Sequence, residues 1–337
     1  MNTCRTQSSP PMARCMIILV NWKRASDTCA CITSLERTVG VEWFAVVCDN
    51  GSPDDSATEL QNFLAEKYTK RIRSTTDPQV FDYYASDTST PRVTLVLSPS
   101  NLGFAGGNNL AYRHAPADVK AEFVWFLNND TEVEPETLSR MVDRMRQDPS
   151  IGICGNTLVY AHDRKTVQTF GGSVYYPWTG IMHEIGNGKT WPCPVDANAV
   201  EARMRYVSGA SALVTSEFID RVGLMCEDYF LYFEEIDWAE RARKAGFRLG
   251  YAPQAVVFHI EGAALGSGKT ARRSMLAEYY AMAGKFAITR RFFPWALPTV
   301  YLFAFLQVLR RYMQGYGARA RMMAEVVLGF RRTPPDK

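Results

Sequence analysis

Three acidic residues crowd the start of an expected helix in the segment "FLYFEEIDWAERARKAGF", which begins at residue 230. They are Glu234, Glu235 and Asp237, and aromatic residues stand on both sides of them. Carboxylates at a helix N-terminus interact favourably with the helix dipole, so capping alone explains their presence. The aromatic neighbours also indicate a partly apolar pocket, in which one carboxylate can act as a general base.

A further carboxylate, Asp130, follows a short apolar run in "FLNNDTEVEP". A strand that ends in Asn-Asn-Asp delivers this side chain to the sheet edge where open α/β folds bind ligands. There it can hold a cation that takes up charge on a diphosphate leaving group. An Asp turn that caps the next helix is the alternative interpretation. His259 closes another apolar run, "AVVFHIEG", and by residue type alone it is more often a core histidine than a metal ligand.

Two glycine-rich stretches resemble phosphate-binding motifs. "AALGSGKT", residues 263–270, fits a P-loop in which Lys269 and Thr270 contact phosphate and magnesium. A P-loop fold opens with this unit, whereas here only residues 271–337 follow, so an NTPase is disfavoured. "SNLGFAGGNNLAYRHA" lacks the G-x-G-x-x-G spacing and follows the third expected strand, which disfavours a Rossmann oxidoreductase. Its glycines allow close approach to a flat ligand, and a helix is expected from about Asn108.

The expected elements place these residues at one edge of a sheet. The runs "MIILVNW", "WFAVVCDNGS", "VTLVLSPSN" and "FVWFLNND" predict buried parallel strands, and helical patterns lie between them. This is a doubly wound α/β arrangement, in which ligands bind beyond the carboxyl ends of the strands. Residues 74–92 are expected to form a surface insertion, residues 236–245 a helix that Gly246 ends, and the chain from about 270 a helical region. The polar residues that follow the strands are Asn21, Asp49, Asn50, Asn101 and Asn128 to Asp130.

Composition bounds the class of protein. The chain has 337 residues, of which 47% are apolar and 22% charged, as in globular proteins. A net charge of +3 gives no reason to expect a nucleic-acid partner. The eight cysteines contain no Cys-x-x-Cys pair, and Cys48 and Cys154 lie in apolar runs, so we expect buried thiols in a reducing compartment. The polar first 15 residues and the short "MIILV" run predict an N-terminus that is not exported.

Taken in chain order, several stretches resemble family 2 glycosyltransferases, and within them the bacterial rhamnosyltransferase-like branch. The resemblance covers about residues 16–330 and implies a GT-A fold, a Rossmann-like mixed sheet flanked by helices, over residues 16–268. Outside this domain we expect a disordered N-terminus at residues 1–15 and a helical, membrane-surface region at residues 269–337. The stretches are "IILVNW", "VVCDNGSPDDS", "NLGFAGGNN", "FLNNDTEVEP", "VSGASALV" and "YFLYFEEIDWAERARKAGFRLGYAPQAVVFHIEG".

The resemblance implies an inverting hexosyltransferase of bacterial surface polysaccharide synthesis. Its expected donor is dTDP-L-rhamnose, with a UDP-hexose or galactofuranosyl donor second, and its acceptor is a hydroxyl of a glycan or lipid-linked glycan. A non-catalytic sugar-binding GT-A module is the alternative, because two positions depart from the family pattern. Asn128 replaces the first acid of the Asp-x-Asp metal motif, and Glu235 replaces the usual catalytic Asp.

The same resemblance implies roles for individual residues. Glu235 is the expected base, with Glu234 or Asp237 as substitutes, and Asp130 and His259 are the expected ligands of one Mg²⁺ or Mn²⁺. Lys269 and Arg272, with Arg273, are expected to close over the diphosphate by charge attraction. The remaining residues expected to bind the donor are Asn21, Asp49, Asn50, Asn101, Gly103, Phe104, Gly106, Asn108 and Asn129.

The C-terminal segment carries signals of a membrane surface. The apolar run 292–309 nearly reaches the ~20 residues needed to span a bilayer, but Pro294 and Pro298 interrupt its start. Paired arginines flank both ends, and a basic amphipathic stretch follows. We expect peripheral attachment to the cytoplasmic face of the bacterial inner membrane rather than a span; a buried helix pair is the alternative. The sequence does not decide whether the protein forms a homo-oligomer.

Overall fold

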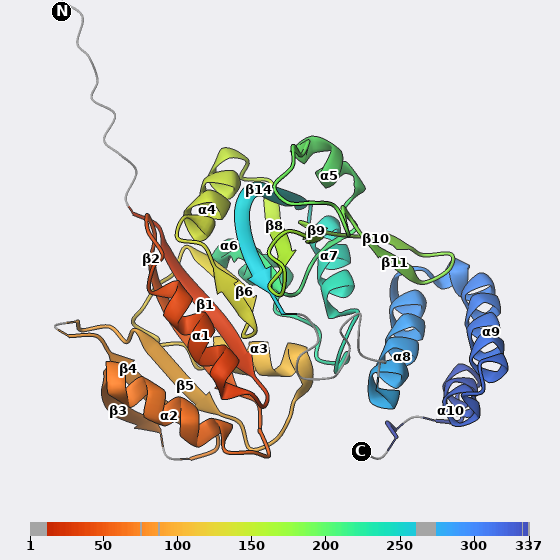
Figure 1. Ribbon diagram of the computed structural model, residues 1–337, viewed down its shortest axis with the longest axis horizontal. Helices are drawn as coiled ribbons and strands as arrows, with labels where there is room; N and C mark the ends of the chain where they lie inside the picture. The colour runs from red at the N-terminus through yellow and green to blue at the C-terminus, as the bar shows by residue number, and fades with distance from the viewer. Residues whose placement is uncertain (1–11, 75, 87, 261–273, 332, 336–337) are drawn as a thin grey trace, which may run out of the picture.

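A computed structural model describes residues 12–74, 76–86, 88–260, 274–331 and 333–335 (Figure 1). Its centre is an 11-stranded mixed sheet with strand order β3-β4-β5-β2-β1-β6-β13-β8-β14-β7, and β9 pairs with β8 at the side. The bounds of its first half are β1 (Arg14–Asn21), β2 (Glu42–Asp49), β3 (Thr69–Ser74), β4 (Gln79–Tyr84), β5 (Val93–Leu97) and β6 (Phe123–Asn128). Those of its second half are β7 (Thr131–Val133), β8 (Ile151–Tyr160), β9 (Val167–Phe170), β13 (Ser211–Thr215) and β14 (Arg248–His259).

The four predicted strands form the parallel centre of this sheet. β5, β2, β1 and β6 pair in parallel, and their apolar runs are buried almost throughout because helices cover both faces. One face carries α1 (Ala25–Leu35), α2 (Ser56–Lys67) and α4 (Thr137–Gln147). The other face carries α3 (Gly103–Arg113), α6 (Ser216–Val222) and α7 (Glu234–Lys244). The doubly wound prediction is therefore confirmed.

Two expectations about this half were wrong. Residues 74–92 are not only a surface insertion, because β4 pairs with β5 and extends the main sheet. The helix expected from about Asn108 begins at Gly103, so the glycine- and asparagine-rich stretch is mostly helix α3. The backbone of Gly103 adopts a left-handed conformation (φ +76°), and a β-carbon there would lie 2.3 Å from the carbonyl oxygen of Phe230. Glycine is thus required by packing at the start of this helix.

The second half builds a small sheet beside the large one. Its strands are β10 (Gly172–Tyr176), β11 (Ile181–Glu184) and β12 (Tyr206–Val207), in the order β11-β10-β12. Helix α5 (Ala197–Arg203) lies between the hairpin and β12 in sequence. The expected helix at 236–245 is α7, which starts two residues earlier, at Glu234. β14 ends at His259, as the apolar run predicted.

The C-terminal region is helical, as predicted, within the residues that are described. It comprises α8 (Met275–Phe292), a 3₁₀ turn (Pro294–Ala296), α9 (Leu297–Met313) and α10 (Gly317–Val327), which stand beside α7 and the β10–β11 hairpin (Figure 1). Aromatic contacts join the two parts: the Tyr175 and Phe293 rings are 5.7 Å apart, and those of Trp178 and Trp295 are 4.3 Å apart. None of the described helices has the length and apolar character that a membrane crossing requires.

Candidate active site

A cavity of ≈ 1250 Å³ opens at the carboxyl ends of the central parallel strands. Its walls come from the loop after β1, the start of α3, the β6–β7 turn, the start of α7 and the end of β14. Helices α8 and α9 and the β10–β11 hairpin form the opposite side. Of the polar residues that follow the separate strands, Asn50, Asn101 and Asn128 to Asp130 line this cavity, at the edge where the topology predicted a site.

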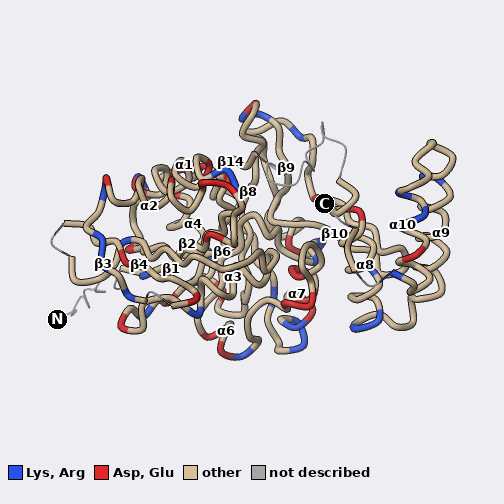
Figure 2. The backbone as a smooth tube through the Cα atoms, turned by 90° about the horizontal axis from the view of Figure 1, so that it is seen from below, with Lys and Arg blue, Asp and Glu red and all other residues tan. Residues whose placement is uncertain are grey.

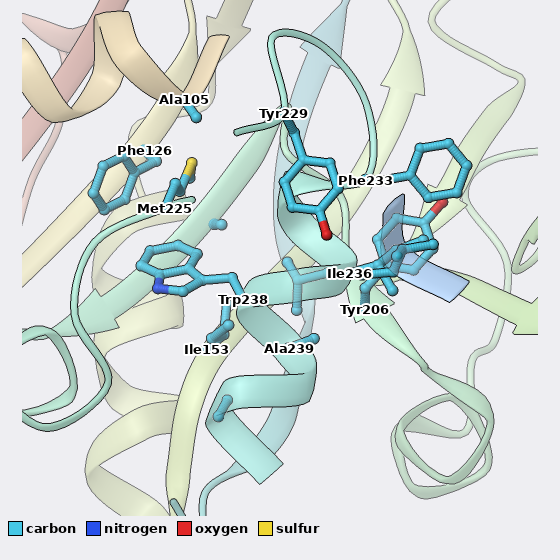
Figure 3. Packing of buried hydrophobic residues seen from close by; sticks show 14 of the residues in the cluster. Ala105, Phe126, Ile153, Tyr206, Met225, Tyr229, Phe233, Ile236, Trp238 and Ala239 are labelled. Carbon is cyan, nitrogen blue, oxygen red and sulfur yellow. The ribbon is translucent and has the colours of Figure 1, made fainter. Parts of the chain in front are cut away.

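Helix α7 carries the three candidate acids and is anchored to the sheet by buried side chains. Ile236 and Trp238 are buried, and the Trp238 ring packs edge-on against Phe126 of β6 at 5.2 Å (Figure 3). Burying one such side chain stabilises the fold by about 1.5–3 kcal/mol. The residues just before the helix, Tyr232 and Phe233, both have left-handed backbones, with φ of 67° and 73°. Bulky residues adopt this conformation at a cost, and functional sites are where such strain gathers.

Glu235 is the acid of the three that lines the cavity. A β-carbon on residue 209 would lie 2.5 Å from Glu235 Oε1, so Gly209 leaves the room that this carboxylate occupies. Burial raises the pKa of Glu235, and hydrogen bonds from the backbone of Glu235 and Gly209 oppose the rise. A raised pKa makes a carboxylate a stronger proton acceptor than an ordinary one, which suits a general base at a cavity wall.

Glu234 and Asp237 point elsewhere. Glu234 is 2% exposed and its Oε2 has no hydrogen-bond partner among the described residues. Burial, and then the charge of Glu235, raise the pKa of Glu234 well above its ordinary value, so the neutral acid is favoured. Asp237 is fully buried and forms ion pairs with Arg241 at 2.6 Å and with Arg291 of α8 at 3.0 Å. Its carboxylate ties α7 to α8 and does not line the cavity.

Asp130 and His259 meet at the cavity from different strands. Asp130 Oδ1 lies 3.2 Å from His259 Nε2, and both residues are largely buried. Burial is the largest single influence on the pKa of Asp130 and raises it, but the charge and hydrogen bond of His259, a backbone hydrogen bond and the charge of Arg24 together lower it on balance. Asn128, at the position of the missing acid, places its Nδ2 3.3 Å from His259 Nε2.

The pair suits a divalent cation. Neighbouring ligands of an octahedral ion with bonds of about 2.1 Å are about 3.0 Å apart, close to the observed separation. His259 Nδ1 lies 2.8 Å from Gln168 Oε1 of β9, and in a neutral ring that donates to that oxygen the lone pair of Nε2 could ligate an ion. Among the described residues no group of three or more His, Cys, Asp or Glu side chains forms a metal cage. An ion held by Asp130 and His259 would need further ligands from substrate or water.

The residues expected to bind the donor divide into two sets. Asn50, Asn101, Gly103, Phe104 and Asn129 line the cavity. Asn50 Oδ1 also accepts from the Leu102 backbone N–H at 3.0 Å, which joins the end of β2 to the start of α3.

The other expected donor residues support the walls from behind. Asn21 and Asp49 end the neighbouring strands β1 and β2, and Asn21 Nδ2 donates to Asp49 Oδ2 at 2.8 Å. Both are buried and do not line the cavity. Gly106 and Asn108 are buried within α3. Lys269 and Arg272, together with Arg273 and the "AALGSGKT" stretch, lie outside the described residues.

Sequence reasoning did not identify four residues that line the cavity. Trp22, Lys23 and Arg24 follow β1, and Lys285 lies in α8. Trp22 and Lys23 line the cavity, and Lys23 Nζ stands 4.5 Å from the centre of the Trp22 ring. Lys23 and Arg24 have left-handed backbones, with φ of 64° and 56°, in a turn that ends in helix α1. The signal available in the sequence was the dipeptide Lys-Arg directly after a buried strand, where a diphosphate would meet positive charge. Lys285 of α8 is the fourth.

The fold is that of the GT-A glycosyltransferases, and Glu235 and the Asp130–His259 pair line a cavity at the strand ends. Residues 16–197, more than half of the chain, match the profile of glycosyl transferase family 2. The chain belongs to that family and is by class a glycosyltransferase, as the sequence predicted.

Among curated proteins, the chain is 24% identical over 252 residues to the low-salt glycan biosynthesis hexosyltransferase Agl10 of Haloferax volcanii, a match that covers 74% of this chain and 67% of that protein. It is 24% identical over 185 residues to the N-acetylglucosaminyl-diphospho-decaprenol L-rhamnosyltransferase of Mycobacterium tuberculosis, over 50% of this chain. The match spans 59% of the mycobacterial protein's own length.

Solved glycosyltransferases share the fold. The mannosyltransferase PcManGT of Pyrobaculum calidifontis, in complex with GDP-Man and Mn²⁺, superposes with a TM-score of 0.52 at 15% identity, covering 95% of this chain and 81% of that one. GalNAc-T7 with UDP, GalNAc and Mn²⁺ gives a TM-score of 0.59 at 11% identity, covering 94% of this chain and 55% of that one. At these identities the likeness establishes the fold alone.

Proposed function

We propose that the protein is an inverting, metal-assisted glycosyltransferase in which Glu235 is the general base. The observation that carries this proposal is geometric. Of the three acids at the start of α7, Glu235 lines the cavity, and the Asp130–His259 pair lines the same cavity. A base and a cation site in one space are what a single displacement at an anomeric carbon requires.

In the proposed reaction Glu235 accepts the proton of an acceptor hydroxyl as its oxygen attacks the anomeric carbon. The bond from that carbon to the diphosphate oxygen breaks on the opposite face, so one displacement inverts the configuration. Asp130 and His259 would hold the Mg²⁺ or Mn²⁺, which supplies positive charge to the leaving diphosphate. Lys23, in the turn after β1, adds charge at the same edge.

For the donor we propose dTDP-L-rhamnose first and a UDP-hexose or galactofuranosyl donor second. The similarity to the mycobacterial rhamnosyltransferase supports the first choice. The similarity to the Haloferax hexosyltransferase supports a wider range. Asn50, Asn101 and Phe104 supply amide and aromatic contacts for a flat base.

For the acceptor we propose a lipid-linked glycan at a membrane surface on the cytoplasmic side of a bacterial inner membrane. The support is the outer face of α9, which buries Val300 and Ala304 and leaves large apolar side chains exposed. Lys and Arg positions occur along the same helical region (Figure 2). An apolar face with flanking cations suits an anionic membrane surface and disfavours the buried helix pair. The exposed apolar residues of α9 are Tyr301, Leu302, Phe303, Phe305, Leu306, Leu309, Tyr312 and Met313.

A panel of nucleotide sugars tests the proposal. With Mn²⁺ present, the purified chain should hydrolyse or transfer one of dTDP-L-rhamnose, UDP-glucose, UDP-galactofuranose and GDP-mannose above background. Proton NMR of the product anomer should then show inversion. Binding of a donor without turnover of any would favour the non-catalytic sugar-binding module.

A further inference from the structure

A buried lysine lies in the cavity wall opposite Asp130 and His259. Lys285 of α8 is 6% exposed, and its Nζ donates to Gln307 Oε1 of α9 at 3.0 Å. No carboxylate of the described residues forms an ion pair with this ammonium group. Its aliphatic stem lies against Gly180 in the β10–β11 turn, where a β-carbon would come within 2.7 Å of Lys285 Cγ. The charged head is therefore fixed in position while two of its three N–H groups have no partner among these residues.

The surrounding wall carries excess positive charge. Arg310 and Arg311 of α9 also line the cavity. Two carboxylates lie on this wall: Glu278 of α8 is paired with Arg311 at 2.6 Å and with Arg319 at 3.2 Å, and Glu184 of β11 accepts from Asn187 Nδ2 at 2.7 Å. Neither Lys285 nor Arg310 forms an ion pair with a carboxylate of the described residues. Buried charges are normally paired, so an unpaired buried ammonium group indicates an anionic ligand.

The position of Lys285 assigns that ligand to the acceptor side. A β-carbon on its neighbour Gly284 would lie 2.6 Å from Phe233 Cδ2, so α8 packs directly on the residue before Glu234 and Glu235. The metal pair and the turn after β1 lie at the strand ends, on the other side of the cavity. A general base stands between donor and acceptor, and Lys285 lies on the α8–α9 side, whose outer face is the exposed apolar face of α9.

We propose that Lys285, with Gln307 and Arg310, binds a phosphate group of a lipid-diphosphate-linked acceptor. This inference rests on the proposed function, because only the role of Glu235 as base makes the α8–α9 side the one from which the acceptor enters. Burial lowers the pKa of Lys285 to about 8, so at pH 7 the ammonium group carries a costly buried charge that a phosphate would neutralise. The charged and titratable groups that share this part of the cavity are Glu278, Arg310, Arg311, His183 and Glu184.

Binding measurements on the full chain test the inference without requiring turnover. The probes are farnesyl diphosphate, farnesol and dTDP, and the proteins are the wild type, Lys285→Met and the control Lys120→Met, an exposed lysine of the α3–β6 connection. Lys285→Met should weaken farnesyl diphosphate binding about 10- to 100-fold, the range for a hydrogen bond to a charged group. Farnesol and dTDP binding should be unchanged, and Lys120→Met should match the wild type.

The other outcomes distinguish the phosphate site, its assignment to the acceptor and the proposed function. Equal losses for farnesol and farnesyl diphosphate, or no loss for either, would overturn the phosphate site. A loss of dTDP binding in Lys285→Met would overturn the acceptor assignment and give Lys285 to the donor diphosphate. If the wild type transfers no sugar from any donor while Lys285→Met still loses farnesyl diphosphate binding, the proposed function fails and the phosphate site stands.

Discussion

Replacing Lys285 by methionine should stabilise the unliganded protein. Burial lowers the pKa of Lys285 from 10.5 to about 8, and the difference is equivalent to about 3 kcal/mol of stability lost at pH 7. Losing the hydrogen bond to Gln307 returns about 1 kcal/mol, because Gln307 is half-buried and can bond to water. Methionine fills nearly the same volume, so the net gain in the free energy of unfolding is about 2 kcal/mol.

The stability change in Lys285→Met should depend on pH in a defined direction. For a lysine whose folded pKa is depressed, the penalty is fully present below about pH 8 and is lost as pH rises through the unfolded value of 10.5. Urea unfolding of Lys285→Met and wild type, followed by tryptophan fluorescence, should therefore show a gain at pH 7 that shrinks by about 2 kcal/mol near pH 10. Lys120→Met should stay within about 0.5 kcal/mol of wild type at both pH values. A Lys285→Met protein less stable than wild type at pH 7, or a gain independent of pH, would refute the reasoning.

Three further predictions concern Glu235, His259 and the exposed face of α9. Gly209→Ala should lower kcat about 100-fold with donor KM unchanged, because the new methyl group displaces the Glu235 carboxylate; steady-state kinetics measure this, and a normal kcat would contradict it. Gln168→Leu should weaken Mn²⁺ activation about 10- to 100-fold by freeing the His259 ring; Mn²⁺ titration checks it, and full activity in EDTA would remove the metal from the account. Exchanging both Leu302 and Phe305 for serine should abolish flotation with anionic vesicles, whereas serine at Ile72, another exposed apolar position, should not; a wild type that never floats would refute the membrane proposal.

Much of the site's scaffold was predictable because local pattern and topology determine it. Continuous apolar runs predicted the parallel strands, and the carboxyl ends of those strands brought Asn21 beside Asp49 and Asp130 beside His259. The extent of α3 was missed because its start depends on the left-handed backbone of Gly103 and on contact with Phe230, far along the chain.

The roles of individual polar residues depended on long-range contacts that spacing does not reveal. Asp237 looked equivalent to its neighbours in sequence, yet Arg291, on a separate helix, occupies its carboxylate. Gln168 gave no signal, because an isolated glutamine in a strand has no characteristic pattern and its partner His259 is 91 residues away. Lys285 was hidden within a helix whose apolar neighbours indicated only packing.

The most direct test of the account compares sugar transfer by the wild type with transfer by Glu235→Gln and Glu234→Gln. Glu235 lines the cavity, so its amide should lower kcat about 10²- to 10⁴-fold, the usual cost of losing a general base, with donor binding retained. Glu234 does not line the cavity and its burial disfavours the charged form, so an amide there should leave most of the activity. Near-normal turnover by Glu235→Gln, or an inactive Glu234→Gln beside an active Glu235→Gln, would contradict the account.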